Sequence, residues 1–138
     1  MTNIKNNIKL TKNFYLHEFS CHNGQKVPKK YLENVKELAS KLQTIRDVLN
    51  KPMYINSAYR PTEYNKSIGG AKRSQHLTAS AADITVKGMT PKQVMRAVRK
   101  LVKNGVIEQG GIGLYNSFIH IDIRSNPTKW DNSSLFNF

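Results

Sequence analysis

Two amphipathic helices are predicted by the spacing of apolar residues along the chain. Between residues 31 and 49, apolar side chains recur at three- and four-residue steps with charged residues between them: Val35, Leu38, Leu42, Ile45 and Leu49. This is the period of one buried helix face. A second helix is expected to begin at Thr90-Pro91, where a cap residue precedes a first-turn proline, and to end at Gly105. Its buried stripe comprises Val94, Val98, Leu101 and Val102.

Four segments have the β-branched or alternating composition of strands: residues 53–58, 81–86, 110–115 and 118–124. A tight turn at Asn116-Ser117 joins the last two. Residues 62–80 are expected to be mostly loop, and the tail, with Trp130 and Phe136, is expected to pack over the domain. These elements predict an α+β fold in which helices pack on one side of a small, mainly antiparallel sheet.

The length of 138 residues fits one domain. Residues 1–13 are polar and basic and are expected to form a loosely held N-terminal arm, with a single domain over residues 14–138. Cys21 is the only cysteine, which excludes an intrachain disulfide, cysteine-rich zinc fingers and iron–sulfur ligation. No apolar run approaches the roughly 20 residues of a membrane span. The N-terminus lacks the apolar core of a secretory signal, so work outside the cytoplasm would require another release route.

The net charge of +13 predicts attraction to a polyanion: nucleic acid, anionic lipid or an acidic cell-wall polymer. A nucleic-acid binder is the least favoured of these hypotheses, because no recognition motif is present and the basic residues are spread along the chain. We therefore expect no specific nucleic-acid partner. The nine acidic residues leave a short list of possible catalytic carboxylates.

Two histidines and an aspartate form the candidate metal site. Alternation along a strand places residues 118, 120 and 122 on one face, so adjacent strands could aim Asp83 and His120 at one point. His76, on the preceding loop, could complete the set. Two imidazoles and one carboxylate are typical of catalytic zinc, with a fourth position left for water. Spacing alone leaves an alternative to the metal site open, in which the histidine in the strand is structural and the aspartate caps a turn.

Several motifs in order resemble one family. Ser74-Gln-His76-Leu-Thr-Ala79-Ser-Ala81-Ala-Asp83 follows the signature S-x-H-x-x-G-x-A-x-D, with Ala79 at the glycine position. Further matches are Phe14 and Glu18, Ser57-Ala-Tyr59-Arg60, Asn65, Gly69-Gly70-Ala71, Gly110-Gly-Ile-Gly113-Leu-Tyr115 and Phe118-Ile-His120-Ile-Asp122. Over about residues 10–130 the chain resembles the zinc D,D-peptidases, which share their fold with lysostaphin-type enzymes and the Hedgehog signalling domain. The family includes D-alanyl-D-alanine carboxypeptidases and dipeptidases, and phage endolysins.

The resemblance implies Zn²⁺ as cofactor, with His76, Asp83 and His120 as its ligands. It also implies that Arg60 holds the substrate, since a guanidinium fork suits a carboxylate or a polarised carbonyl; the alternative is that Arg60 only pins a loop. Ser74 is expected to form hydrogen bonds near the site and contact substrate. Some relatives carry a catalytic Glu three residues before the last ligand, where this chain has Ser117.

With that Glu missing, we assign the general base to Asp122. It shares a strand face with His120 at about 7 Å along the strand. The alternative is that Asp122 orients His120 or Arg124 from behind. Glu63 and Glu108 are the next candidates.

The predicted function is a zinc peptidase that cleaves peptidoglycan stem peptides, as a monomer. We expect a phage or prophage lysis enzyme, made in the cytoplasm and acting at the wall after release, or carried in a virion. The cleaved bond stays open among D-Ala-D-Ala, L-Ala-D-Glu and a cross-bridge. The missing Glu supports an alternative, a non-hydrolytic, zinc-containing wall-binding domain of the same fold.

Overall fold

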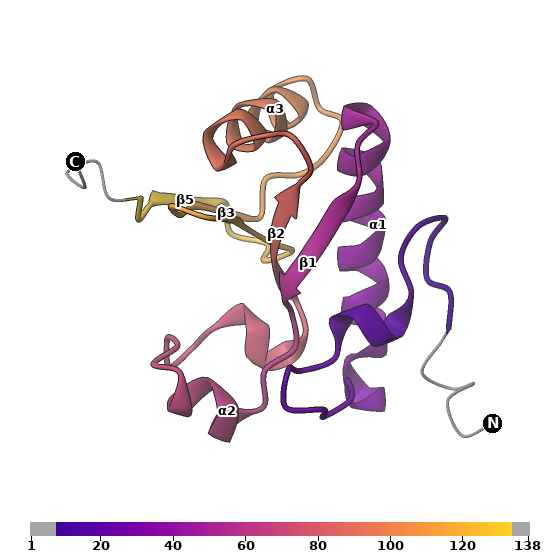
Figure 1. Ribbon diagram of the computed structural model, residues 1–138, viewed down its shortest axis with the longest axis vertical. Helices are drawn as coiled ribbons and strands as arrows, with labels where there is room; N and C mark the ends of the chain where they lie inside the picture. Colours follow the sequence, from indigo (N-terminus) through magenta and orange to yellow (C-terminus); the bar gives the residue numbers. More distant parts are fainter. Residues whose placement is uncertain (1–7, 134–138) are drawn as a thin grey trace.

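A five-stranded sheet forms the centre of the computed structural model, which describes residues 8–133 (Figure 1). The strands lie in the order β1-β2-β4-β3-β5, and their bounds are β1 Met53–Ser57, β2 Ala81–Val86, β3 Gly111–Leu114, β4 Ile119–Asp122 and β5 Thr128–Asp131. Neighbouring strands are antiparallel except β3 and β5, which are parallel. The helices of the described residues are α1 Leu32–Leu49, α2 Thr62–Ser67 and α3 Pro91–Lys103, with short 3₁₀ helices at η2 Leu16–Phe19, η3 Lys29–Tyr31 and η4 Gln75–Thr78. The predicted α+β class is confirmed.

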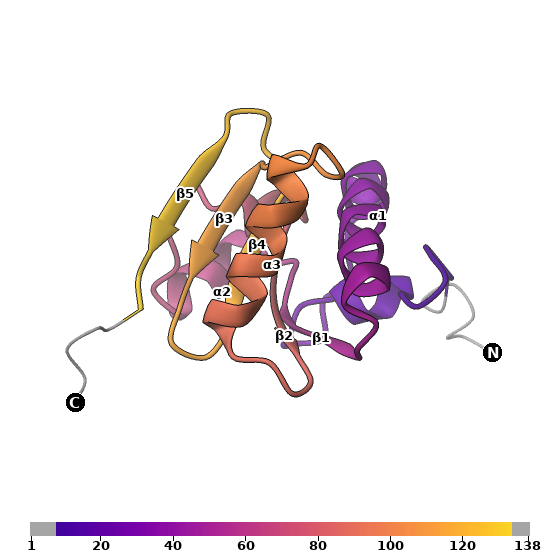
Figure 2. The same cartoon turned by 90° about the horizontal axis from the view of Figure 1, so that it is seen from above.

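Alternation along the strands gives the sheet one apolar face and one polar face. Ala82 and Ile84 of β2 and Ile119 and Ile121 of β4 are buried in the same apolar core as the inner sides of α1 and α3. Figure 2 shows α3 lying across the middle strands, with α1 beside it. Each fully buried aliphatic side chain of this kind stabilises the fold by about 1.5–3 kcal/mol. The residues between them in sequence point to the opposite face, where the candidate site lies.

Both long helices begin and end close to where their sequences predict. Thr90 Oγ1 accepts a hydrogen bond from Gln93 N, and Gln93 Oε1 accepts one from Thr90 N, so α3 starts with a capping box. Gly105, with φ of 74°, follows its last turn. Helix α1 ends at Asn50, which adopts the left-handed conformation at φ 52°.

The prediction for residues 62–80 is wrong in part, because α2 and η4 lie within that segment. Helix α2 has six residues and η4 has four, which is too few for the apolar period of a helix to be recognised in the sequence. Both lie beyond the end of β1 and away from α3 (Figure 1). They bring the 68–76 segment over the polar face of the sheet.

The tail contains a strand that the sequence does not predict. Trp130 belongs to β5, which extends the sheet beside β3, while Phe136 lies outside the described residues. Strand β5 has four residues, of which only Trp130 is apolar, so its sequence lacks the alternation from which a strand is predicted. In the arm, Thr11 Oγ1 and Asn13 N both donate to Gln43 Oε1 at 2.8 Å, so these two residues contact α1. The domain boundary at residue 14 stays a prediction.

Within residues 8–133, no helix has both the length and the apolar character needed to cross a membrane.

Candidate metal centre

Strand pairing places two of the three candidate ligands side by side. Asp83 on β2 lies directly opposite His120 on β4, and both project from the polar face of the sheet. His76 comes from η4, the short helix before β2. Ser74 caps that helix, because its Oγ accepts a hydrogen bond from His76 N at 3.1 Å. Ala79 ends the helix at φ 57°, a left-handed conformation that explains why the motif has a glycine there.

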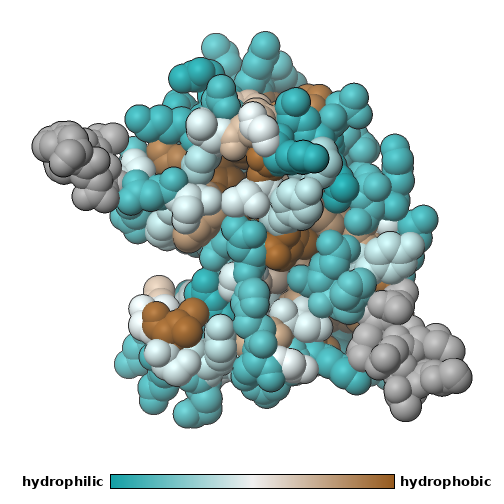
Figure 3. Space-filling view, viewed as in Figure 1, coloured by the Kyte–Doolittle hydropathy of each residue, from teal (hydrophilic) through white to brown (hydrophobic). Residues whose placement is uncertain are grey.

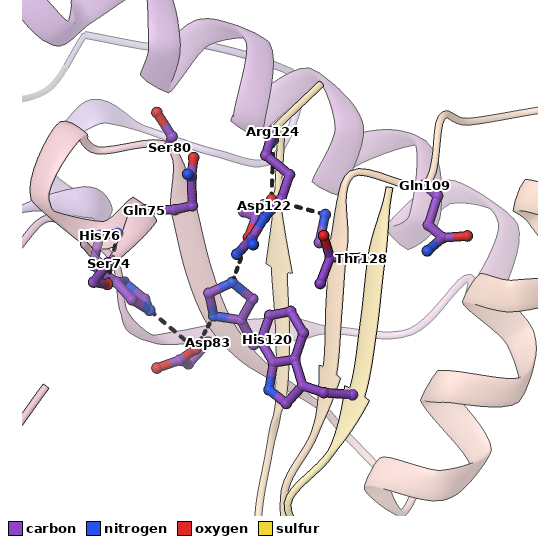
Figure 4. A network of polar contacts seen from close by, with 12 residues as sticks. Ser74, Gln75, His76, Ser80, Asp83, Gln109, His120, Asp122, Arg124 and Thr128 are labelled. Atoms are coloured by element: carbon purple, nitrogen blue, oxygen red, sulfur yellow. Dashed lines mark hydrogen bonds and ion pairs between the residues drawn. The ribbon is translucent and has the colours of Figure 1, made fainter. Parts of the chain in front are cut away.

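Both imidazole rings converge on one carboxylate oxygen of Asp83. His76 Nε2 and His120 Nδ1 each lie 3.2 Å from Asp83 Oδ1, and the two rings meet edge to face with centroids 5.2 Å apart. The three ligand atoms lie within 4.8 Å of one another. Figure 4 shows both imidazoles pointing at Asp83. All three residues are buried, with 2–6% of their surface exposed.

The outer nitrogen of each imidazole is held by an acceptor. His76 Nδ1 lies 2.6 Å from the Ala58 carbonyl oxygen, and His120 Nε2 lies 2.7 Å from Asp122 Oδ2. A neutral imidazole has one N–H, so donation to these acceptors leaves His76 Nε2 and His120 Nδ1 with lone pairs. These two lone pairs and the Asp83 carboxylate face one another, which is a donor set that fits a dication. Two nitrogens and one oxygen suit zinc.

The titration behaviour of the cluster reflects the same convergence. Burial raises the pKa of Asp83, but the adjacent His120 and His76 rings outweigh burial and hold that pKa well below its ordinary value. Burial lowers the pKa of His120, but hydrogen bonds to Asp122 and Asp83 outweigh it and raise that pKa. The two carboxylates therefore stabilise positive charge on the His120 ring.

Asp122 lies behind His120 rather than beside the metal ligands. Its side chain is fully buried. Oδ1 accepts hydrogen bonds from Gly111 N at 2.8 Å and from Arg124 N and Nε at 3.0 Å, and Oδ2 accepts from Arg124 Nη2 at 2.7 Å. In Figure 4 His120 stands between Asp83 and Asp122. Because both oxygens are enclosed, the geometry favours the alternative role for Asp122, orientation of His120 and Arg124.

Close neighbours explain the glycines at Gly110, Gly111 and Gly113. A Cβ on Gly111 would lie 2.2 Å from Asp122 Oδ2, and a Cβ on Gly110 would lie 2.2 Å from the Asp122 carbonyl oxygen. A Cβ on Gly113 would lie 2.3 Å from the Trp130 indole. The glycines therefore make room for the carboxylate and for the indole.

Arg60 reaches the site through the free oxygen of Asp83. Its Nη2 donates to Asp83 Oδ2 at 3.1 Å, while Nε donates to Ser57 Oγ at 3.1 Å and Nη1 to Asn65 Oδ1 at 3.4 Å. The side chain is mostly buried, yet it also lines the cavity over the site. Arg60 thus contacts both its neighbouring loop residues and a candidate ligand residue.

A cavity of about 700 Å³ opens over the three ligands. Residues 68–71 and 73–76 line one side, and Tyr115, Phe118 and Trp130 line the other. The surface is indented between the α2 region and the β3–β5 edge (Figure 3). Among the described lining residues, Asp83 is the only carboxylate. Glu63 is exposed on α2 outside this lining, and Glu108 lines a separate cavity beside Lys41.

The sequence pattern predicts neither Trp130 nor the Tyr115 side chain as part of the site. The tryptophan stands alone in a polar segment, so its pattern carries no signal. Gly113 was the available clue, since a strand glycine often marks the close approach of another group.

A buried His-Asp-His cluster at the floor of a cavity defines a metallohydrolase type of site. A family model described as Peptidase M15 matches residues 12–122, most of the chain. The chain belongs to this family of zinc D,D-peptidases, which makes it a metallopeptidase of the D-Ala-D-Ala carboxypeptidase type. The match ends before β5. No curated protein sequence matches the chain.

Proposed function

We propose that the protein is a zinc-dependent peptidase that cleaves the peptide stems of bacterial peptidoglycan, as a carboxypeptidase or an endopeptidase. The observation that carries the proposal is the convergence of His76 Nε2, Asp83 Oδ1 and His120 Nδ1 on one point of the cavity floor. A zinc ion held by these atoms would polarise the scissile carbonyl and lower the pKa of a water molecule toward about 7.

The chain's own residues keep this ligand set in position. Asp122 holds the outer nitrogen of His120, the Ala58 carbonyl holds that of His76, and Arg60 holds the second oxygen of Asp83. Such contacts fix the tautomer and the ring orientation of the ligands. We assign Asp122 to this positioning role in place of the general base.

Arg60 also has capacity to bind substrate. A guanidinium has five N–H groups, and Arg60 uses three of them toward Asp83, Ser57 and Asn65. The remaining donors can bind a carboxylate or a carbonyl oxygen of a peptide in the cavity. Ser74 contributes by placing His76, since its hydroxyl caps η4.

Positive charge supports an anionic cell wall as the place of action. Helix α3 contains no acidic residue, and its exposed side carries five cations: Lys92, Arg96, Arg99, Lys100 and Lys103. A surface of this kind attracts acidic wall polymers over about one Debye length. We extend the proposal to a phage or prophage lysis enzyme, or a virion-borne one, that works as a monomer, because all ligands come from one chain.

A second candidate is a zinc-containing wall-binding domain without turnover. It is favoured by the cavity lining, in which Asp83 is the only carboxylate among the described residues and is held by Arg60. A free carboxylate to accept a proton from water is therefore missing from that lining.

Digestion of purified peptidoglycan separates these candidates. The zinc-loaded protein should release fragments whose masses identify the cleaved bond, and His120→Ala should release none. Wild-type protein that holds zinc and binds the wall but releases no fragment would establish the binding domain instead.

A further inference from the structure

Tyr115 and Trp130 are two aromatic residues in the lining of the cavity that also contains His76. Tyr115 follows β3, and its backbone N donates to the Phe118 carbonyl at 3.0 Å, which closes the β3–β4 turn. Its ring stacks on Phe118 with centroids 4.4 Å apart and planes 13° apart. The β3–β4 turn therefore holds the Tyr115 backbone, and stacking on Phe118 holds the plane of its ring.

Trp130 fixes the hydroxyl end of Tyr115. The indole Nε1 lies 3.0 Å from Tyr115 Oη. The indole itself packs 5.0 Å from the His120 ring and lies under the Arg124 guanidinium at 5.3 Å. Gly113 supplies the space beneath it, since a Cβ there would overlap the indole. The indole is therefore held on several sides, and the Tyr115 hydroxyl is held by it.

Hydrogen-bond chemistry then determines where the Tyr115 proton can go. An indole N–H only donates, so Tyr115 Oη is the acceptor in its bond to Trp130. The phenolic proton remains available, and no protein acceptor for it is found among residues 8–133. Tyr115 lines the same cavity as His76, Asp83 and His120. A phenol that already accepts a hydrogen bond is also a stronger donor, because hydrogen bonds in a chain polarise one another.

We propose that Tyr115 donates a hydrogen bond to the scissile carbonyl oxygen of the substrate as negative charge develops on it, and that Trp130 is the positioning residue for that donor. The phenolic proton stays on Tyr115 throughout, so no bond is made or broken by this residue. The inference rests on the proposed peptidase function. It adds a neutral donor to a cavity whose lining also holds Arg60, Arg73 and Arg124, of which Arg60 is bonded to Asp83 and Arg124 to Asp122.

Tyr115→Phe tests the proposal, because it removes the hydroxyl and keeps the stack on Phe118. Loss of one oxyanion donor typically lowers kcat by about 100-fold or more. We expect that loss with KM and zinc content unchanged, since the lost interaction is made only in the transition state. Tyr54→Phe is the matched control, because Tyr54 is an exposed tyrosine on β1.

Trp130→Phe tests the positioning role. We expect a smaller loss of kcat, on the order of 10-fold, and a double variant no worse than Tyr115→Phe alone, because Trp130 acts through the tyrosine hydroxyl. A second readout is the affinity for a phosphinate analogue of the cleaved dipeptide, which carries a negative oxygen at a tetrahedral centre. Tyr115→Phe should weaken that affinity by about the same factor as kcat.

Wild-type kcat and phosphinate affinity in zinc-loaded Tyr115→Phe would overturn the inference and leave the peptidase function standing. A rise in KM with unchanged kcat would also overturn it, since it would show ground-state binding by the hydroxyl. Zinc-loaded wild-type protein that cleaves no peptidoglycan bond would overturn the proposed function and this inference with it.

Discussion

Asp122→Asn distinguishes a positioning residue from a general base. The substitution keeps the shape of the side chain and replaces one acceptor oxygen by an NH₂ donor. Each oxygen of Asp122 faces donors only: His120 and Arg124 on one side, and the backbone of Gly111 and Arg124 on the other. The new NH₂ group must therefore oppose a donor in either orientation.

When the NH₂ group of Asn at position 122 faces His120, metal binding is weakened. An NH₂ group next to Nε2 favours the tautomer in which Nε2 accepts, which puts the imidazole proton on Nδ1 and removes the lone pair that faces Asp83. Loss of such a supporting contact typically weakens zinc binding by about 10–100-fold. The charge-assisted bond to His120 contributes about 1.5–3 kcal/mol, while the bond to the partly exposed Arg124 contributes less. We expect the free energy of unfolding of the metal-free protein to fall by about 2–4 kcal/mol.

Zinc affinity by competition with a chelator, and kcat at saturating zinc, are the two assays. The positioning role predicts weaker zinc binding and a kcat within a few-fold of wild type once zinc is saturating. Asp131→Asn is the control, because Asp131 lies exposed on β5 and, within residues 8–133, its side chain accepts hydrogen bonds only from Ser133. Unchanged zinc affinity with kcat lowered about 100-fold or more would refute the reasoning and restore Asp122 as the base.

Three further outcomes follow from the same structure. Arg60→Lys should not rescue the loss of about 2–3 kcal/mol in kcat/KM expected for Arg60→Ala, because an ammonium cannot reproduce the planar fork; near wild-type kinetics for Arg60→Ala would contradict this. Binding to purified wall should weaken as salt rises, and more steeply for wild type than for Arg96→Glu/Arg99→Glu on α3, whereas a flat salt response would count against the basic surface. Burial lowers the pKa of Lys41 although Asp122 opposes the shift, so the unfolded chain binds more protons just below pH 10.5 and the contribution of Lys41 to stability rises with pH there. Denaturant titrations should show that rise vanish in Lys41→Met and persist in the exposed control Lys36→Met.

The candidate ligands could be predicted because local rules determine them. Alternation along β2 and β4 places Asp83 and His120 on one face, and antiparallel pairing of these strands brings them opposite each other. The apolar period likewise predicts α1 and α3, and the capping residues predict where α3 begins.

The role of Asp122 could not be read from its position on β4. Both proposed roles require the same strand face, and the choice depends on side-chain rotamers and on Arg124, whose guanidinium encloses the carboxylate. The position of Trp130 beside the site could not be predicted either, because β5 is a short polar strand whose pairing with β3 depends on the fold as a whole. The short helix α2 has too few residues for an apolar period.

Zinc content tests the central claim most directly. Elemental analysis of zinc-loaded, gel-filtered protein should find one zinc per chain in the wild type and in His17→Ala, a control in which an exposed histidine is removed. His76→Ala, Asp83→Ala and His120→Ala should each hold far less, because a three-ligand site has no spare donor. Full zinc in all three ligand variants, or none in the wild type, would contradict the account.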